Sequence, residues 1–401
     1  MTGANDNTAA VAARRDDLVE LTSAFVAIPS ENPPDVDLRA AQRWLSAQLD
    51  HFEIDHDIID SSSDGGDHRV VVGTVGSDGP LLYLHGHYDV VPAFDPAQFA
   101  PTVADGAIVG RGAADMKSGL VAMLLAAVIH RDAGRSGRIK LVFVPDEETG
   151  GAHGSERLQE LGVITDDGAV GAIVAEPSFP DIWCAARGAL TIEVTVAGRA
   201  AHVGHHYTGV NAFTAAHEVV QELIDYQTRV VEHRTELRIE PEAARHSIML
   251  IGGTAAGGTN FNIVPDVFRF TIDRRPNPDE DYDRARAELL AVLDDLAERF
   301  DLGYRILQDV DPAHTPPGDQ LVTVLHGAIA EVAGRHASLT MCPGCLETRV
   351  YNRAGIPAVA YGPGPSAVMH GPDEHVPIAN LLEACEVYVT VLERLLARPD
   401  H

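Results

Sequence analysis

Residues 81–89 place two imidazoles and a carboxylate directly after an apolar segment. Residues 81–84 read LLYL, and His85, His87 and Asp89 follow at alternate positions. Alternate side chains of an extended chain point to the same side, and imidazole and carboxylate groups are the nitrogen and oxygen ligands of zinc-like metals. The segment is therefore a candidate for binding a divalent cation, although a polar loop after a buried strand would have the same composition.

Four further segments carry an acid or an imidazole next to an apolar stretch. In chain order these residues are Asp115, Asp146, Glu147, Glu148, Glu176 and His370. Ligands of open α/β sheets bind beyond the carboxyl ends of the strands, so side chains that follow successive strands are expected at one edge of one sheet. Carboxylates that crowd together repel one another, and divalent cations remove that repulsion. A cluster of about five ligands that share one aspartate suits two cations.

Each of these residues also has an ordinary structural interpretation. The acids at 146–148 could form a solvated turn, and Asp115 could cap the apolar helix that begins near Lys117. Glu176 could be a plain loop residue before Pro177. Their joint placement beside successive apolar stretches favours the metal site over these alternatives.

The elements that must position these side chains alternate between strand and helix. Apolar residues three and four apart predict helices within residues 16–50 and over 117–131. Strands are expected at residues 69–75, 81–85, 139–144 and 171–175. This alternation predicts an α/β domain with a mixed, mostly parallel sheet flanked by helices.

The pattern changes near Arg187. The segment ALTIEVTV alternates apolar and polar residues, as an antiparallel strand with one solvated face does. Helices at 211–226 and 279–299 and two strand-like segments follow in β-α-β-β-α-β order, which is typical of a ferredoxin-like α+β sandwich. From about residue 311 the helix–strand alternation resumes. We therefore expect one discontinuous domain of residues 1–186 and 311–401, interrupted by a smaller domain of residues 187–310.

The composition excludes several classes of partner. The chain of 401 residues has 30 Lys and Arg against 59 Asp and Glu, which gives a formal net charge of −29. Nucleic acid and anionic membranes need a positive surface, and no stretch reaches the roughly 20 apolar residues of a membrane span. Four cysteines in so long a chain do not form a disulfide framework. We expect a cytoplasmic protein with no nucleic-acid or membrane partner.

The segments that carry the candidate ligands resemble, in order, the motifs of the M20 family of metallopeptidases and deacylases. This family includes acetylornithine deacetylase, succinyl-diaminopimelate desuccinylase, aminoacylase and glutamate carboxypeptidase. The metal motifs are HGHYDVVP, GRGAADMKSG, VPDEETGG, AEPS and HGPDEHVPI, and the lid motifs are GRAAHVG, NFNIVPD and DRRP. The resemblance covers nearly the whole chain. It implies a zinc-exopeptidase-like fold whose inserted domain serves as lid and dimerisation domain.

The resemblance also implies a site with two divalent ions, zinc in the first place and cobalt or manganese as alternatives. His87, Asp115 and Glu176 would hold one ion. Asp115, Glu148 and His370 would hold the other, with Asp115 bridging the two. The predicted reaction is hydrolysis of an amide by a water molecule that the metals activate.

Further roles follow from the same resemblance. Asp89 would accept the second N–H of the His87 ring and so orient it. Glu147 would be the general base and would later protonate the leaving amine. His202 would stabilise the oxyanion from the partner subunit of a homodimer, with a lid closure. As a surface loop residue beside His205 and His206, His202 also has a plain structural interpretation.

Three residues of the inserted domain resemble those that hold a substrate carboxylate in this family: Arg187, Asn262 and Arg275. The planar guanidinium binds carboxylate in two places. For Arg275 the alternative is an ion pair with Asp273 or Asp279. The chain departs from many relatives at CPGCLETR (342–349), which we interpret as a substrate-pocket loop; a lone CxxC is a poor zinc signal.

The sequence therefore predicts hydrolysis of a small N-acyl amino acid, of the deacetylase or desuccinylase type. A metallo-exopeptidase, a dipeptidase or an aminohydrolase would use the same residues. A nucleotide-binding oxidoreductase is disfavoured because neither GTVGSDG nor GRGAADMKSG supplies G-x-G-x-x-G between a strand and a helix. A non-catalytic metal-binding protein of the same fold is disfavoured by Glu147, because metal binding does not need a base.

Overall fold

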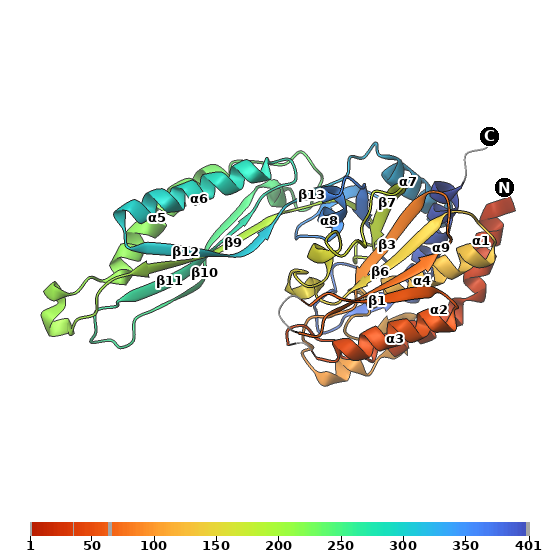
Figure 1. The fold of residues 1–401 in the computed structure, drawn as a ribbon, viewed down its shortest axis with the longest axis horizontal. Helices are drawn as coiled ribbons and strands as arrows, with labels where there is room; N and C mark the ends of the chain where they lie inside the picture. The colour runs from red at the N-terminus through yellow and green to blue at the C-terminus, as the bar shows by residue number, and fades with distance from the viewer. Residues whose placement is uncertain (1, 35, 63–65, 398–401) are drawn as a thin grey trace. The chain divides into compact units, whose positions relative to one another are not determined.

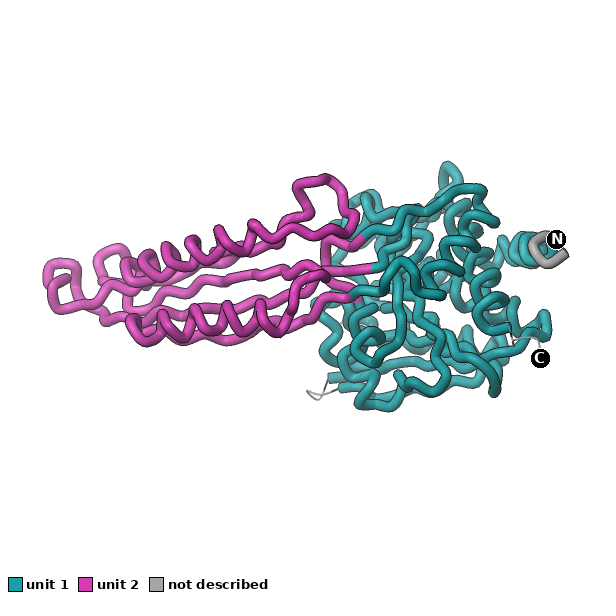
Figure 2. Tube along the Cα trace, turned by 90° about the horizontal axis from the view of Figure 1, so that it is seen from above, with its two compact units in different colours: residues 1–184, 314–340, 347–401 teal, residues 185–313, 341–346 magenta. Residues whose placement is uncertain are grey.

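The computed structural model describes residues 2–34, 36–62 and 66–397. The chain forms two units (Figure 2): unit 1 comprises Met1–Cys184, His314–Thr340 and Glu347–His401, and unit 2 comprises Ala185–Ala313 and Met341–Leu346. The sequence placed the boundaries of the inserted domain at residues 187 and 310. The structural units divide within three residues of those positions, and residues 341–346 also join unit 2.

Unit 1 is built on a large sheet with the strand order β1-β2-β6-β3-β7-β15-β8-β13, and β14 pairs with β8 (Figure 1). In that order the strands are β1 (Asp55–Asp60), β2 (Arg69–Val75), β6 (Arg138–Val144), β3 (Leu81–His87), β7 (Ala169–Val174), β15 (Ala358–Ala360), β8 (Ile182–Ala186), β13 (Ala313–His314) and β14 (Leu339–Cys342). The central strands β6, β3, β7 and β15 run parallel, whereas β1 and β2 are antiparallel. The predicted mixed, mostly parallel sheet is confirmed.

Helices cover both faces of this sheet, which is why its central strands are apolar at successive positions. Every residue of β3 is buried. The helices of unit 1 are α1 (Thr2–Ala13), α2 (Arg15–Val26), α3 (Leu38–His51), α4 (Lys117–Asp132), α7 (Gln320–Ala333), α8 (Thr348–Arg353) and α9 (Ile378–Leu396). α4 is buried along almost its whole length between β3, β6, α2 and α9. Tyr83 of β3 packs instead with Val350 and Tyr351 of α8.

A second, small sheet in unit 1 joins two loops that are far apart in the sequence. Its strands are β4 (Thr102–Ala104), β5 (Ala107–Val109) and β16 (His375–Pro377), in the order β16-β5-β4. The pairing of β16 with β5 is antiparallel and aligns His375 with Val109. It brings the segment after His370 beside the segment before Asp115.

Unit 2 has the predicted β-α-β-β-α-β order. Its antiparallel sheet has the order β10-β11-β9-β12, with β9 (Ala189–Ala197), β10 (Ile248–Gly257), β11 (Val267–Arg275) and β12 (Leu302–Val310). Helices α5 (Ala212–Val230) and α6 (Tyr282–Arg299) supply Leu223 and Leu289 to a core with Ile192 and Phe270. Short 3-10 helices complete both units: η1 (Pro96–Phe99), η2 (Glu147–Thr149), η3 (Ser155–Arg157), η4 (Val203–Thr208) and η5 (Glu242–Arg245).

No helix among the described residues combines the length and the apolar composition that crossing a membrane requires.

Close packing of α4 against the strand ends predicts a stability difference between two helical glycines. At Gly119 of α4 a methyl group would lie 2.5 Å from Cβ and 2.8 Å from O of Ala175, next to the proposed ligand Glu176. At Gly327 of α7 the nearest atom would be Nη1 of Arg394 at 3.6 Å. We expect Gly119→Ala to lower the free energy of unfolding by about 1–3 kcal/mol because of overpacking.

The control Gly327→Ala should raise the free energy of unfolding by up to about 1 kcal/mol, since alanine is the better helix former. Urea denaturation followed by circular dichroism measures both variants. Equal effects of the two substitutions would contradict the packing described for α4.

Candidate metal centre

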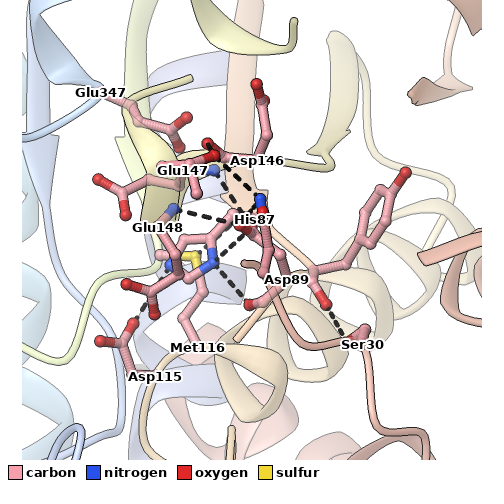
Figure 3. Close-up of polar contacts among 12 residues, drawn as sticks. Ser30, His87, Asp89, Asp115, Met116, Asp146, Glu147, Glu148 and Glu347 are labelled. Atoms are coloured by element: carbon pink, nitrogen blue, oxygen red, sulfur yellow. Dashed lines mark hydrogen bonds and ion pairs between the residues drawn. The ribbon is translucent and has the colours of Figure 1, made fainter. Parts of the chain in front are cut away.

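The carboxyl ends of the parallel strands meet at one edge of the unit 1 sheet. His87 is the last residue of β3 and is aligned with Val144, the last residue of β6. The acids at 146–148 follow β6 directly, and Glu176 follows β7. Because neighbouring parallel strands end together, the polar residues after them are delivered to the same place. Figure 3 shows His87, Asp115, Glu147 and Glu148 directed toward one another there.

The five predicted metal ligands lie in one cluster. His87 Nε2 is 3.2 Å from Asp115 Oδ1 and 4.0 Å from Glu176 Oε1. His370 Nε2 is 3.2 Å from Asp115 Oδ2 and 3.3 Å from Glu148 Oε1. The two oxygens of Asp115 thus face different imidazoles, which is the placement that a bridging carboxylate needs.

The chemistry of these groups fits divalent cations. Donor atoms of His87, Asp115 and Glu148 all lie within 4.8 Å of one another, and so do those of His87, Glu147 and Glu176. Within the described part of the chain, the buried Oε1 atom of Glu176 accepts no hydrogen bond, whereas Oε1 of Glu148 lies 3.3 Å from Nε2 of His370. A buried carboxylate oxygen without a donor is costly unless a cation neutralises it, so the orphaned oxygen of Glu176 points to a bound ion.

Burial and mutual repulsion disturb the protonation of the whole cluster. Burial, together with Asp115 and Glu147, raises the pKa of Glu176 well above its usual value. Burial also raises the pKa of Glu147 well above its usual range. Hydrogen bonds to Asp115 and Glu148 raise the pKa of His370 to about 10. Without cations the cluster therefore retains protons that a metal ion would displace.

His87 and Asp115 shift each other's pKa in opposite directions. Burial alone would lower the pKa of His87, but its contacts with Asp115 and Asp89 outweigh burial and raise that pKa well above its usual value. For Asp115, burial would raise the pKa, yet the contacts with His370 and His87 lower it. Asp115 is therefore the carboxylate of the cluster that stays ionised most readily, as a ligand shared by two ions must.

Asp89 holds two parts of the cluster together. Its carboxylate accepts the main-chain N–H groups of Glu147 at 3.2 Å and of Glu148 at 3.1 Å, and the amide of Asn32 at 3.0 Å. Nδ1 of His87 lies 3.2 Å from Oδ1 and 3.0 Å from the main-chain oxygen of Asp89. Asp89 is buried, so the His87 ring and the turn after β6 are set by one carboxylate.

Sequence reasoning missed Glu347, which lies beside this cluster (Figure 3). Its buried carboxylate is 2.6 Å from Nε2 of His85 and accepts a hydrogen bond from Ser155. The other ring nitrogen of His85 is 3.0 Å from the hydroxyl of Tyr351. Both ring nitrogens of His85 thus contact protein groups, as expected for a structural histidine. The only local signal was the position of an acid directly before the short helix α8.

The remaining predicted residues belong to unit 2 and are described within it. His202 is exposed, and its Nδ1 accepts the N–H of Gly204 at 3.1 Å. The main-chain oxygen of Asn262 accepts the N–H of Val203 at 2.9 Å. These contacts place His202 and Asn262 on the same part of unit 2, since main-chain bridging also joins His202 to Ile263.

The two arginines of unit 2 have partners in the protein. Arg187 is buried and donates to Asn277 at 3.1 Å and to the main-chain oxygen of His246 at 3.1 Å. Nε of Arg275 is 2.8 Å from Asp273 Oδ1, which is the ion pair named above as the alternative for this residue. Their binding of substrate stays a prediction.

Comparison with known proteins identifies the family of this chain. The sequence profile of peptidase family M20/M25/M40 matches residues 83–394. The chain is 29% identical over 396 residues to the succinyl-diaminopimelate desuccinylase of Xanthomonas euvesicatoria pv. vesicatoria, an alignment covering 95% of this chain and 99% of that protein.

Two solved structures have a similar fold. The dipeptidase Dug1p of Saccharomyces cerevisiae superposes with a TM-score of 0.78 at 16% identity, over 99% of each chain. A dinuclear metal-binding peptidase of the M20 family from Bacillus subtilis superposes with a TM-score of 0.66 at 16% identity, over 96% of this chain and 99% of that one. At these identities the likeness concerns the fold alone.

The protonation of the cluster predicts that metal binding releases protons. A ligating imidazole must be neutral, whereas His370, with a pKa of about 10 in the metal-free protein, is protonated at pH 7. Zn²⁺ affinity should therefore rise with pH between 6 and 7.5, by about tenfold per unit for each proton released. Calorimetric titration in buffers of different ionisation enthalpy measures the number of protons.

His370→Asn should release fewer protons per bound ion than the native protein. The control is His326→Asn, because His326 stacks on His336 and on no residue of the cluster. If the Zn²⁺ affinity of the native protein did not change with pH, that result would contradict the protonation described here.

Proposed function

This chain belongs to peptidase family M20/M25/M40, and we propose that it is a two-metal hydrolase that removes the acyl group from a small N-acyl amino acid. The family makes it a hydrolase of amide or related C–N bonds. The observation that carries the proposal is the position of Asp115 between two histidines, with each of its oxygens 3.2 Å from a different ring.

The proposal assigns one ion to His87, Asp115 and Glu176 and the other to Asp115, Glu148 and His370. Zinc is the first candidate, with cobalt and manganese as alternatives. When bound, such a pair lowers the pKa of a water molecule and polarises the substrate carbonyl. Asp89 keeps the His87 ring in its orientation through the contact at Nδ1.

Glu147 carries the proton in this proposal. Its side chain shares the cluster with His87 and Glu176, while Glu148, its neighbour, faces His370. As the general base, Glu147 takes a proton from the attacking water and gives it to the nitrogen of the leaving amine. This return of the proton lets the amine leave as a neutral group and restores the base for the next turnover.

The relatives support the choice of substrate class. Curated relatives that align over nearly the whole chain include succinyl-diaminopimelate desuccinylases, so an N-succinyl or N-acetyl amino acid is the first choice. A dipeptide is the second choice, because a dipeptidase is among the solved structures with a similar fold. We propose that Arg187, Asn262 and Arg275 hold a substrate carboxylate, and the guanidinium of Arg187 also donates to Asn277 and to the main-chain oxygen of His246.

We further propose a homodimer formed through unit 2. Unit 2 exposes several large apolar side chains near His202: Phe261 is 98% exposed and Tyr207 74% exposed. Val203, Val210 and Phe213 add to this exposed apolar surface. Contiguous exposed apolar residues mark interaction sites, and a dimer in which His202 serves the partner's site would complete the oxyanion contact. None of the four cysteines, all of which lie within the described residues, forms a disulfide, and we propose a cytoplasmic location.

Replacing the base should separate catalysis from metal binding. We expect Glu147→Gln to lower kcat by about 100- to 10,000-fold, while metal content stays at the native value because the five ligands remain. A panel of N-succinyl, N-acetyl and dipeptide substrates, assayed for the free amine, identifies the substrate on which kcat is compared. Native turnover by Glu147→Gln would show that another group is the base.

Mixing two inactive variants tests the shared active site. His202→Ala lacks the lid histidine and Glu147→Gln lacks the base, so each homodimer should be inactive. If His202 serves the partner's site, heterodimers contain one intact site, and an exchanged equimolar mixture should recover about a quarter of native activity. No recovery, with subunit exchange verified by mass spectrometry, would contradict the role of His202 across the dimer.

A further inference from the structure

Glu374 lies at the centre of a buried hydrogen-bond cradle. The residue is 1% exposed. Its Oε1 accepts the main-chain N–H groups of Gly112 at 2.9 Å, Ala114 at 3.0 Å and Asp115 at 3.0 Å. Its Oε2 pairs with the guanidinium of Arg111. One carboxylate thus fixes the backbone of the loop that ends in Asp115, the ligand shared by the two proposed ions.

Arg111 extends the same contacts to the loop that carries His370. The guanidinium is buried, and its Nη2 donates to the main-chain oxygen of His370 at 3.3 Å and of Pro92 at 3.5 Å. The N–H of Gly110 donates to the main-chain oxygen of Glu374 at 2.9 Å. Arg111 and the N–H of Gly110 therefore both join the loop before Asp115 to the loop around His370.

The backbone of His370 needs such support. Its φ is +60°, in the left-handed region that side chains other than glycine seldom adopt. A residue in that region persists only when its surroundings hold it. The contact of Arg111 with the His370 carbonyl is one such restraint. His370 is itself half-exposed, so packing alone holds its ring weakly.

We propose that Glu374 and Arg111 are positioning residues that set the separation between Asp115 and His370 and thereby determine the affinity for the ion held between them. Glu374 meets only main-chain N–H groups and Arg111, and Arg111 meets main-chain oxygens and Glu374, in the contacts given above. We assign neither residue a role as metal ligand, base or substrate contact. This inference rests on the proposed two-metal function.

The proposal predicts an unequal loss of the two ions. Two ligands of the first proposed ion, His87 at the end of β3 and Glu176 after β7, make no contact with Glu374 in the contacts given above. The ion between Glu148 and His370 depends on both loops that the Glu374–Arg111 pair joins. Weakening the pair therefore affects the second ion more than the first, although both share Asp115.

Glu374→Gln is the sharpest substitution. The amide keeps the volume of the side chain but removes the charge and turns one acceptor into a donor, so either the N–H cradle or Arg111 loses its partner. We expect the affinity for the ion between Glu148 and His370 to fall about 10- to 100-fold, as for other residues that orient metal ligands. The affinity for the ion between His87 and Glu176 should change less. Saturating metal should restore kcat, with KM near the native value.

The test is a Co²⁺ titration of the metal-free protein, followed by visible absorption and by bound metal after gel filtration. The matched control is Glu383→Gln, since Glu383 of α9 pairs with Arg335 and Tyr361 rather than with Arg111 or the main-chain N–H groups before Asp115. The control should bind both ions as the native protein does. Circular dichroism of each metal-free variant verifies its fold.

Each outcome decides one claim. Native affinity for both ions in Glu374→Gln would overturn the positioning role, and so would a loss of kcat that saturating metal does not restore. If Glu374→Gln does not fold, Arg111→Lys carries the test, because lysine keeps the charge but loses the planar reach to His370; it must show the same selective loss. A native protein that binds fewer than two ions would refute the proposed function instead.

Discussion

Four acidic side chains gather around two imidazoles at the carboxyl edge of the unit 1 sheet, and this concentration of charge is the constraint on which the rest of the site depends. Asp115, Glu147, Glu148 and Glu176 share this space with His87 and His370. Two imidazolium groups cannot balance four carboxylates, and burial raises the cost of each unpaired charge. Divalent ions would resolve the imbalance, and the side chains are ligands of the kind that zinc prefers.

The fold keeps these groups together through a second layer of acids that bind protein groups. Asp89 receives two main-chain N–H groups from the turn after β6, and Glu374 receives three from the loop before α4. Glu347 pairs with His85 on the other side of the cluster. These three acids bind protein groups and thereby restrict the positions of the proposed metal ligands. The donor atoms of the ligands therefore do not have to be ordered by the ions alone.

Much of this arrangement could be predicted from the sequence because it depends on local patterns. Apolar runs revealed β3, β6 and β7, and the polar residues directly after them are the proposed ligands. The helix α1 was not expected, since its sequence TGANDNTAAVAA lacks an apolar stripe. The three-residue strands β5 and β16 are too short to show a period of two. Their pairing, which brings Glu374 to the loop before Asp115, could therefore not be predicted from the sequence.

Other features required tertiary contacts that no local pattern reports. Glu347 and Glu374 stand in polar loops and look like solvated acids until the partners His85 and Arg111 are known. Residues 341–346 return to unit 2 after a long stretch of unit 1, which composition does not signal. For Arg275 the sequence offered both a substrate contact and an ion pair, and only the structure provides the distance to Asp273.

The most direct test of the account is anomalous diffraction at the zinc edge from crystals of the native protein grown with Zn²⁺. We predict two peaks about 3.5–4 Å apart, one beside His87 and Glu176 and one beside Glu148 and His370, with Asp115 between them. A single peak elsewhere would contradict the account. The absence of any peak would also contradict it, if the same protein still hydrolyses an N-acyl amino acid after its metal has been removed by a chelator.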